Sequence, residues 1–169
     1  MPIKTSVLEV TMDHEKYMDL AIKQAKKALA NNETPIGAVV VHKDGTILGR
    51  GYNKMEKIKC QTGHAEVVAI QKACKKIGDW RLNNCCIYVT LEPCTMCFGL
   101  IMLSRIDKLI FGAESPLFGY KNNKNIQIVK KDLVISEGIK KEECEKLLRR
   151  FFKKIRREKE YNEAKASVF

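Results

Sequence analysis

The stretch CIYVTLEPCTMCFGLIMLSR, residues 86–105, decides the fold of this chain. Its first six residues form an apolar run rich in β-branched and aromatic side chains, which predicts a buried strand. Pro93 then fits the opening of a helix that carries Cys94 and Cys97 in its first turn. Because residues at i and i+3 share a helix face, both sulfur atoms can reach one metal ion. The stretch therefore predicts a strand that leads directly into a metal-binding helix start.

The same alternation of strand and helix extends over the rest of the chain. Apolar residues at helical spacing predict further helices over residues 14–30, 64–78 and about 140–162. Further strands are predicted at 36–42, 47–53 and 107–113, a loop at 115–125, and one short extended piece at Ile126–Val129 or Leu133–Ile135. Strands alternating with helices imply a sheet covered on both faces. We therefore expect a single domain over residues 1–169, of the α/β class, with a three-layer α/β/α sandwich.

The composition of the 169 residues is that of a globular protein, with 45% hydrophobic and 30% charged residues. No apolar run approaches the roughly 18 residues that a membrane span needs. The first residues lack an apolar core of signal-peptide length, so we expect a cytoplasmic protein. In a reducing compartment, a close pair among the seven cysteines favours metal binding or catalysis over a disulfide.

The charge is strongly basic, with 31 Lys and Arg against 20 Asp and Glu and a formal net charge of +11. Such a field attracts polyanions, which makes nucleic acid the first partner to consider. Many lysine-rich proteins bind no nucleic acid, so charge alone leaves this open. The basic helix at about 140–162 combines an apolar stripe with Lys and Arg at most of its other positions.

The thiolate ligands of the Cys94–Cys97 pair point to zinc. A structural zinc site would need a second close pair, and adjacent Cys85 and Cys86 do not qualify because neighbouring strand residues face opposite sides of a sheet. Three isolated cysteines are expected to be small buried hydrophobic residues: Cys60, Cys74 and Cys144. A thioredoxin-like dithiol is disfavoured because the motif falls past the middle of the chain.

His64 is the best candidate for a third zinc ligand. His14 lies in a charged helix start and His42 at a strand end, where we expect solvated or capping side chains. His64 opens a helix just as Cys94 opens the next one, and helices that start at the same edge of a sheet bring their N-termini together. Three protein ligands leave one position for water, which is the pattern of a catalytic zinc site.

Glu66 follows His64 by two residues, a spacing that does not place both side chains on one helix face. From the first helical turn, its carboxylate can still project into the cleft and reach the reactive water. There it can shuttle protons while the metal lowers the pKa of that water. The joint pattern, H-x-E followed by P-C-x-x-C, is far more specific than a lone C-x-x-C.

These motifs match the signature of the zinc-dependent nucleoside and nucleobase deaminases. From about Tyr17 to Arg157 the chain most closely resembles the bacterial tRNA-specific adenosine deaminases. The likeness is carried by TPIGAVVV, GYN, HAE, YVTLEPCTMC, SRIDKLIFGA, EGIKKEEC and LLRRFFKKIRR. The resemblance implies a cytidine-deaminase-like sandwich around a five-stranded mixed sheet, one zinc ion per subunit, and a homodimer. It further implies hydrolytic deamination of adenosine to inosine at wobble position 34 of a tRNA anticodon stem-loop.

The resemblance also implies individual roles. Glu66 would take the proton of the water, protonate the ring nitrogen and assist the loss of ammonia. Asn53 would hydrogen-bond the base, the Ala65 N–H would meet the developing oxygen substituent on C6, and Ile36 would line the pocket. On the basic helix, the implied RNA contacts are Phe152, Lys153 and Arg156, where aromatic stacking and positive charge together hold splayed bases.

One segment departs from the family. Bacterial tRNA deaminases usually have an Asp- and Lys-containing loop where this chain has ESPLFGYKNNKN, residues 114–125, and its LFG resembles the eukaryotic counterparts. This leaves substrate choice open. One alternative is a nucleobase or nucleotide deaminase acting on guanine or cytosine, against which the basic helix argues. The other is a non-catalytic zinc-containing nucleic-acid-binding protein, against which an intact Glu66 argues.

Overall fold

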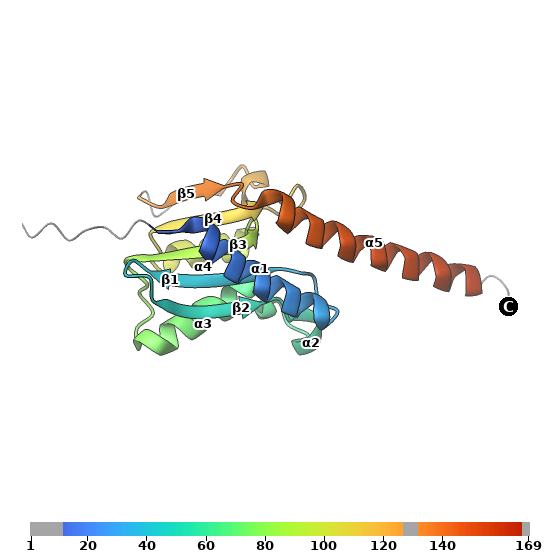
Figure 1. Ribbon diagram of the computed structural model, residues 1–169, viewed down its shortest axis with the longest axis horizontal. Helices are drawn as coiled ribbons and strands as arrows, with labels where there is room; N and C mark the ends of the chain where they lie inside the picture. Colours follow the sequence, from blue (N-terminus) through green and yellow to red (C-terminus); the bar gives the residue numbers. More distant parts are fainter. Residues whose placement is uncertain (1–11, 127–131, 167–169) are drawn as a thin grey trace, which may run out of the picture.

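The computed structural model describes residues 12–126 and 132–166, and Figure 1 shows how they are arranged. The helices and strands along the chain are α1 His14–Ala30, β1 Gly37–His42, β2 Ile47–Tyr52, α2 Met55–Ile58, α3 Ala65–Ile77, β3 Cys85–Leu91, α4 Thr95–Leu103, β4 Lys108–Ala113, β5 Val134–Glu137 and α5 Lys141–Ala166. Two short 3-10 helices, η1 Gln61–Gly63 and η2 Tyr120–Asn122, lie in the loops before α3 and after β4.

The strands form one five-stranded mixed sheet with the order β2-β1-β3-β4-β5. β1 is antiparallel to both β2 and β3, whereas β3, β4 and β5 run parallel to one another. The carboxyl ends of the three parallel strands therefore meet at one end of the sheet, which we name the carboxyl end. The pairings of Gly37 with Tyr52 and of Ala38 with Val89 place the start of β1 and the end of β2 there as well.

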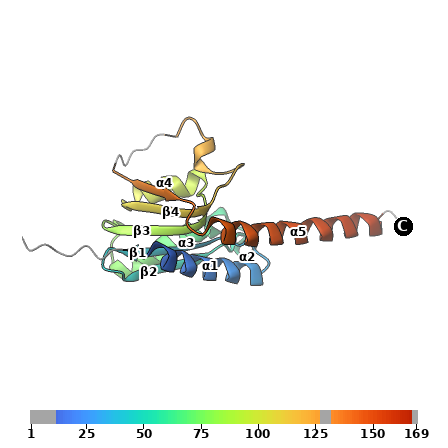
Figure 2. The same ribbon diagram turned by 45° about the horizontal axis from the view of Figure 1, so that its top comes forward.

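Two apolar cores lie on opposite faces of this sheet. Ala38, Val40 and Ile87 belong to the core covered by α3 and α4, whereas their neighbours along the strands belong to the core covered by α1 and the first half of α5. The alternation follows from the two-residue period of side chains along a strand. The three-layer α/β/α sandwich around a five-stranded mixed sheet is thereby confirmed (Figures 1 and 2).

Glycines in β2 let α3 approach the sheet closely. A Cβ atom on Gly49 would collide with the carbonyl oxygen of Ala69, and one on Gly51 would collide with the carbonyl oxygen of Ala65. Gly51 lies at the carboxyl end of the sheet, so this close packing holds the N-terminus of α3 at that end. The antiparallel course of β2 and α3 also aligns the whole helix with the edge of the sheet.

Most predicted elements are confirmed, with differences at their ends. β3 begins at Cys85, one residue before its predicted start, and α5 runs over Lys141–Ala166 instead of about 140–162. Of the two candidates for the last extended piece, β5 confirms the second, while residues 127–129 of the first lie outside the described residues. The short helices α2, η1 and η2 carry no periodic apolar pattern that a sequence could show.

The C-terminal half of α5 projects beyond the body of the molecule (Figures 1 and 2). Its first half packs on the sheet through buried Cys144, with Leu147 and Leu148 against the same core. Where it leaves the body, the Lys154 ammonium donates to the side-chain oxygen of Asn32 at 3.3 Å. None of the helices in the described ranges has the length and apolar character that crossing a membrane requires.

Candidate zinc centre and active site

The starts of α3 and α4 meet at the carboxyl end of the sheet. α4 follows directly after β3, and α3 is held there by its contact with Gly51. His64 is the N-cap residue of α3 and Cys94 is the N-cap residue of α4. Their side chains approach each other, with 3.7 Å between the Nδ1 atom of His64 and Cys94 Sγ. Both are therefore available to face a shared ligand.

The three predicted zinc ligands are brought together. The Nδ1 atom of His64 lies 3.7 Å from Cys94 Sγ and 3.5 Å from Cys97 Sγ. All three donor atoms lie within 4.8 Å of one another, and they form the one candidate metal cluster found among the described residues. The prediction that helices starting at one edge bring these residues together is confirmed.

These distances fit a tetrahedral zinc ion. Zinc binds sulfur at about 2.3 Å and nitrogen at about 2.0–2.1 Å, so tetrahedral angles place the two donor atoms about 3.6 Å apart. The observed nitrogen–sulfur separations lie on either side of that value. The donor set is thus spaced for zinc, with the Nδ1 atom of His64 as the ligand atom of the ring.

The surroundings also favour a thiolate. The hydrogen bond from the Cys97 thiol is the largest cause that lowers the pKa of Cys94, to about 4, and the bond with His64 adds to it. The same hydrogen bond, followed by burial, raises the pKa of Cys97. Without a metal, one negative charge therefore settles on Cys94, next to the partial positive charge of a helix N-terminus.

Glu66 lies in the first turn of α3 and is almost completely buried, with 4% of its surface exposed. Burial is the main cause that raises its pKa to about 7. A carboxyl group with a pKa near neutrality can both accept and donate a proton at physiological pH. Glu66 is not among the three candidate metal donors, but His64, Cys94 and Cys97 all influence its pKa, so its carboxyl group lies near them.

The other histidines and cysteines lie elsewhere. The His14 ring is hydrogen-bonded to the Tyr88 hydroxyl at 2.9 Å and is half-buried, so the expectation of a solvated or capping residue is wrong for it. His42 lies 3.1 Å from the Asp44 carboxylate in the β1–β2 turn. Cys144 is buried as expected. Cys60 is exposed in the loop after α2, against expectation, and its thiol lies 3.1 Å from the Thr62 hydroxyl.

The predicted pocket residues lie around the same end of the sheet. The backbone N–H of Asn53, just after β2, donates to the carbonyl oxygen of Ile36, just before β1, at 3.0 Å. Asn53 is buried, and Ile36 packs against the core beneath α3. Ala65 is fully buried at the first position of α3. Their shared location comes from the antiparallel pairing of β1 and β2, which joins residues 17 positions apart in the sequence.

Glu92 has a positioning role that the sequence analysis missed. Its buried carboxylate accepts hydrogen bonds from the backbone N–H groups of Ser115 and Lys121 at 3.1 and 3.0 Å. Gly119 forms a β-bridge with Cys94, and a Cβ atom there would collide with Glu92. The divergent loop after β4 is therefore fixed against a zinc ligand. The sequence feature that could have indicated this role is the position of an acidic residue directly before Pro93 and Cys94.

The three predicted RNA contacts lie on α5 and are exposed. Phe152 has 44% of its surface exposed, whereas neighbouring Phe151 is buried and contacts it edge to face at 5.4 Å. Lys153 and Arg156 point into solvent on the part of α5 that leaves the body. α5 begins after β5 and therefore starts at the carboxyl end of the sheet, the end that holds the candidate zinc ligands.

Comparison with known proteins connects this geometry to a family. The family model described as the cytidine and deoxycytidylate deaminase zinc-binding region matches residues 11–113. The chain is 42% identical to a tRNA-specific adenosine deaminase of Bacillus subtilis (strain 168), over 86% of this chain and 92% of that protein.

Two solved structures are also similar. One, from a study of A-to-I editing by tRNA:A34 deaminases, is 34% identical with a TM-score of 0.72, over 79% of this chain and 99% of that one. The other is a guanine deaminase from Bacillus subtilis, 35% identical with a TM-score of 0.59, over 69% of this chain and 73% of that one.

The family match covers more than half of the chain and includes both halves of the donor cluster. The match to the Bacillus subtilis relative covers 86% of the chain, a larger share than the family model, which ends at residue 113. The chain belongs to the cytidine and deoxycytidylate deaminase zinc-binding family and, within it, to the tRNA-specific adenosine deaminases.

Proposed function

We propose that this protein hydrolyses adenosine at wobble position 34 of a tRNA to inosine, with release of ammonia. The observation that carries the proposal is the cluster of His64, Cys94 and Cys97 beside a buried glutamate at the carboxyl end of the sheet. Zinc held by these three ligands would supply Lewis-acid activation of a water molecule for attack on C6 of adenine. The names of the similar proteins support the tRNA substrate.

Each remaining step falls to residues of this chain. Glu66 accepts a proton from the attacking water, passes it to a ring nitrogen, and then assists the departure of the C6 amino group as ammonia. Asn53 binds the base by a hydrogen bond, and Ile36 lines one wall of the pocket. The N–H of Ala65, at the positive end of α3, stabilises the oxygen that develops on C6.

The basic helix α5 supports RNA over a free base as the substrate. Phe152 is exposed and can stack on an unpaired base, and Lys153 and Arg156 can pair with the phosphates that flank it. A free base carries no phosphate and would leave these cations without a role. We therefore propose that these three residues contact the anticodon stem-loop.

A homodimer is part of the proposal. α4 carries apolar residues on all sides, as is typical of a helix that is covered all round. In the single chain, however, Met96 and Leu103 lie one heptad apart on the same face with 43% and 68% of their surfaces exposed. A second copy packed on α4 would cover this stripe.

We also propose a cytoplasmic location, where tRNA is available and thiolate ligands stay reduced.

The decisive experiment incubates zinc-loaded protein with an adenosine-34 anticodon stem-loop and detects inosine by sequencing. Guanine, cytosine and deoxycytidine monophosphate are tested alongside for release of ammonia. Inosine formed only in the stem-loop is the expected outcome. The similar guanine deaminase structure makes guanine the competing substrate, and ammonia from guanine alone would overturn the proposal.

A further inference from the structure

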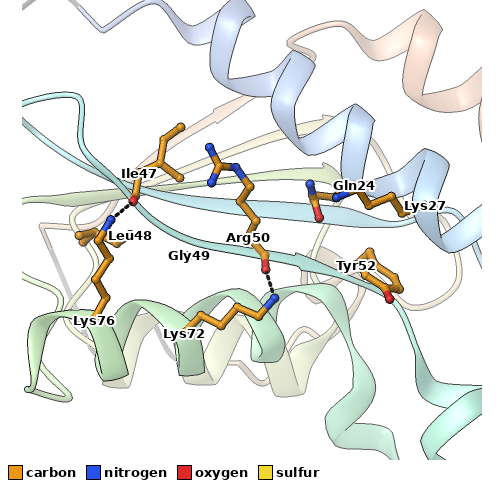
Figure 3. Close-up of a pocket in the computed structure, with 9 residues that line it drawn as sticks. All are labelled: Gln24, Lys27, Ile47, Leu48, Gly49, Arg50, Tyr52, Lys72 and Lys76. Atoms are coloured by element: carbon orange, nitrogen blue, oxygen red, sulfur yellow. Dashed lines mark hydrogen bonds between the residues drawn. The ribbon is translucent and has the colours of Figure 1, made fainter.

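An open groove of about 350 Å³ lies along the edge strand β2 (Figure 3), and none of the candidate zinc donors lines it. α1 borders it on one side of the strand and α3 on the other. Four of its lining residues are cations, Lys27, Arg50, Lys72 and Lys76, and none is acidic. All four are exposed, and in the described part of the chain none of them forms an ion pair. The groove therefore concentrates uncompensated positive charge.

The two lysines of α3 are held in place by the strand itself. The ammonium group of Lys72 donates to the carbonyl oxygen of Arg50 at 2.9 Å, and that of Lys76 donates to the carbonyl oxygen of Ile47 at 2.8 Å (Figure 3). Each ammonium has further donor positions that remain free for an anion. Because the side chains are already ordered, binding an anion costs them less conformational entropy than it would cost mobile lysines.

The same bonds disfavour a protein strand as the occupant. An added strand would need the outward carbonyl groups of β2, and two of these already accept from lysine side chains. Lysines along an edge strand are a common protection against such pairing. A second copy of this basic protein would also bring like charges together. Charge complementarity instead favours a polyanion.

One end of the groove lies close in sequence to a residue expected to bind the base. The groove ends at Tyr52, the residue directly before Asn53, and β2 runs about 17 Å away from that point. Lys72 and Lys76 follow Ala65 by seven and eleven residues on α3, which places them about 10 and 17 Å along the helix. The positive charges are thus spread along the edge strand, starting near the end of the sheet that holds the candidate zinc donors.

We propose that this groove binds the sugar-phosphate backbone of the RNA on one side of the target nucleotide, while α5 contacts the other side. The inference rests on the proposed tRNA deamination and adds a second RNA-binding surface to it. Phosphates on a single strand track a positively charged channel in this way without any readout of sequence.

The test compares two double variants that change the net charge equally. Lys72→Glu/Lys76→Glu removes the groove cations of α3, whereas Lys16→Glu/Lys108→Glu removes two exposed lysines that do not line the groove. Binding of an adenosine-34 anticodon stem-loop is measured from 0.05 to about 0.3 M salt, because each lost phosphate contact lowers the salt slope by about 1. We expect the groove variant to bind about tenfold more weakly with a slope smaller by about 2.

Arg50→Gln provides an independent variant, because it leaves both lysine–carbonyl bonds in place. It should lower the salt slope by about 1 and raise KM for the stem-loop, with unchanged zinc content. Equal binding by the groove and control variants would overturn the inference. So would a groove variant that changes sedimentation of the dimer but not RNA affinity, since the edge would then be a protein interface. Absence of inosine in the wild type would refute the proposed function separately from the groove.

Discussion

Two close pairs of cysteines lie within 13 residues of each other, and only one of them can chelate a metal. Cys85 and Cys86 are adjacent in β3, so their side chains enter the two opposite cores of the sandwich. Cys94 and Cys97 lie at the start of α4, and both face His64. The pairs share their residue type and differ in backbone geometry.

Their chemistry differs accordingly. Burial raises the pKa of Cys85 to about 12, which keeps it a neutral thiol that fills space. Hydrogen bonds from its neighbours lower the pKa of Cys94 to about 4. The comparison teaches that two cysteines suit metal binding at a helix start. There their side chains lie on one face, and the helix N-terminus stabilises a thiolate.

The largest effect is expected from removing a ligand. Cys94→Ala or His64→Ala should lose zinc and all deamination, because two remaining donors hold the ion poorly. Elemental analysis of the purified protein measures the metal. The matched control is Cys85→Ala, which should keep its zinc. Unchanged zinc content in either ligand variant would remove that residue from the site.

Glu66→Gln should keep zinc and the fold but lower the rate of inosine formation by about 10²–10⁴-fold. The reason is that an amide cannot accept a proton from water and pass it on to the substrate. Single-turnover kinetics on the stem-loop and a zinc assay on the same sample separate chemistry from metal loss. Turnover at the normal rate would disprove the role given to this residue.

Cys94 should be alkylated about a hundredfold or more faster than Cys85, because the thiolate is the reactive form of a cysteine. After zinc is removed with a chelator, iodoacetamide should modify Cys94 and spare buried Cys85, as read by mass spectrometry. Exposed Cys60 serves as an internal standard. Added zinc should protect Cys94 and leave Cys60 unchanged; a Cys94 that reacts equally with and without zinc would contradict its assignment.

The smallest effect concerns stability without metal. Cys85→Ala should cost about 1 kcal/mol of the free energy of unfolding, because it leaves a small cavity in the core. Cys94→Ala should cost much less, since Cys94 is half-exposed. Urea denaturation of chelator-treated samples measures both. When the denaturation is repeated with zinc present, Cys94→Ala should lose more stability than Cys85→Ala. If Cys85→Ala still lost more, Cys94 would not bind the metal.

The sequence was most informative about local geometry. Periodicity predicted the main helices and strands because each element buries one face, and the H-x-E and P-C-x-x-C spacings predicted the donor cluster. His14 was misjudged because its hydrogen-bond partner, the Tyr88 hydroxyl, lies 74 residues away in the sequence. Glu92 was missed for the same reason, since its partners follow more than 20 residues later.

By itself, the sequence determined the elements, the close Cys94–Cys97 pair and the basic character of the chain, because these depend on residue type and short spacing. Only the tertiary structure decided that Ile36 and Asn53 lie at the same end of the sheet as the zinc ligands. It also decided that Arg50 of β2 and the lysines of α1 and α3 line one groove. The physical reason is that strand pairing and helix packing set the relation between distant residues. Local sequence patterns do not predict how those strands and helices pack against one another.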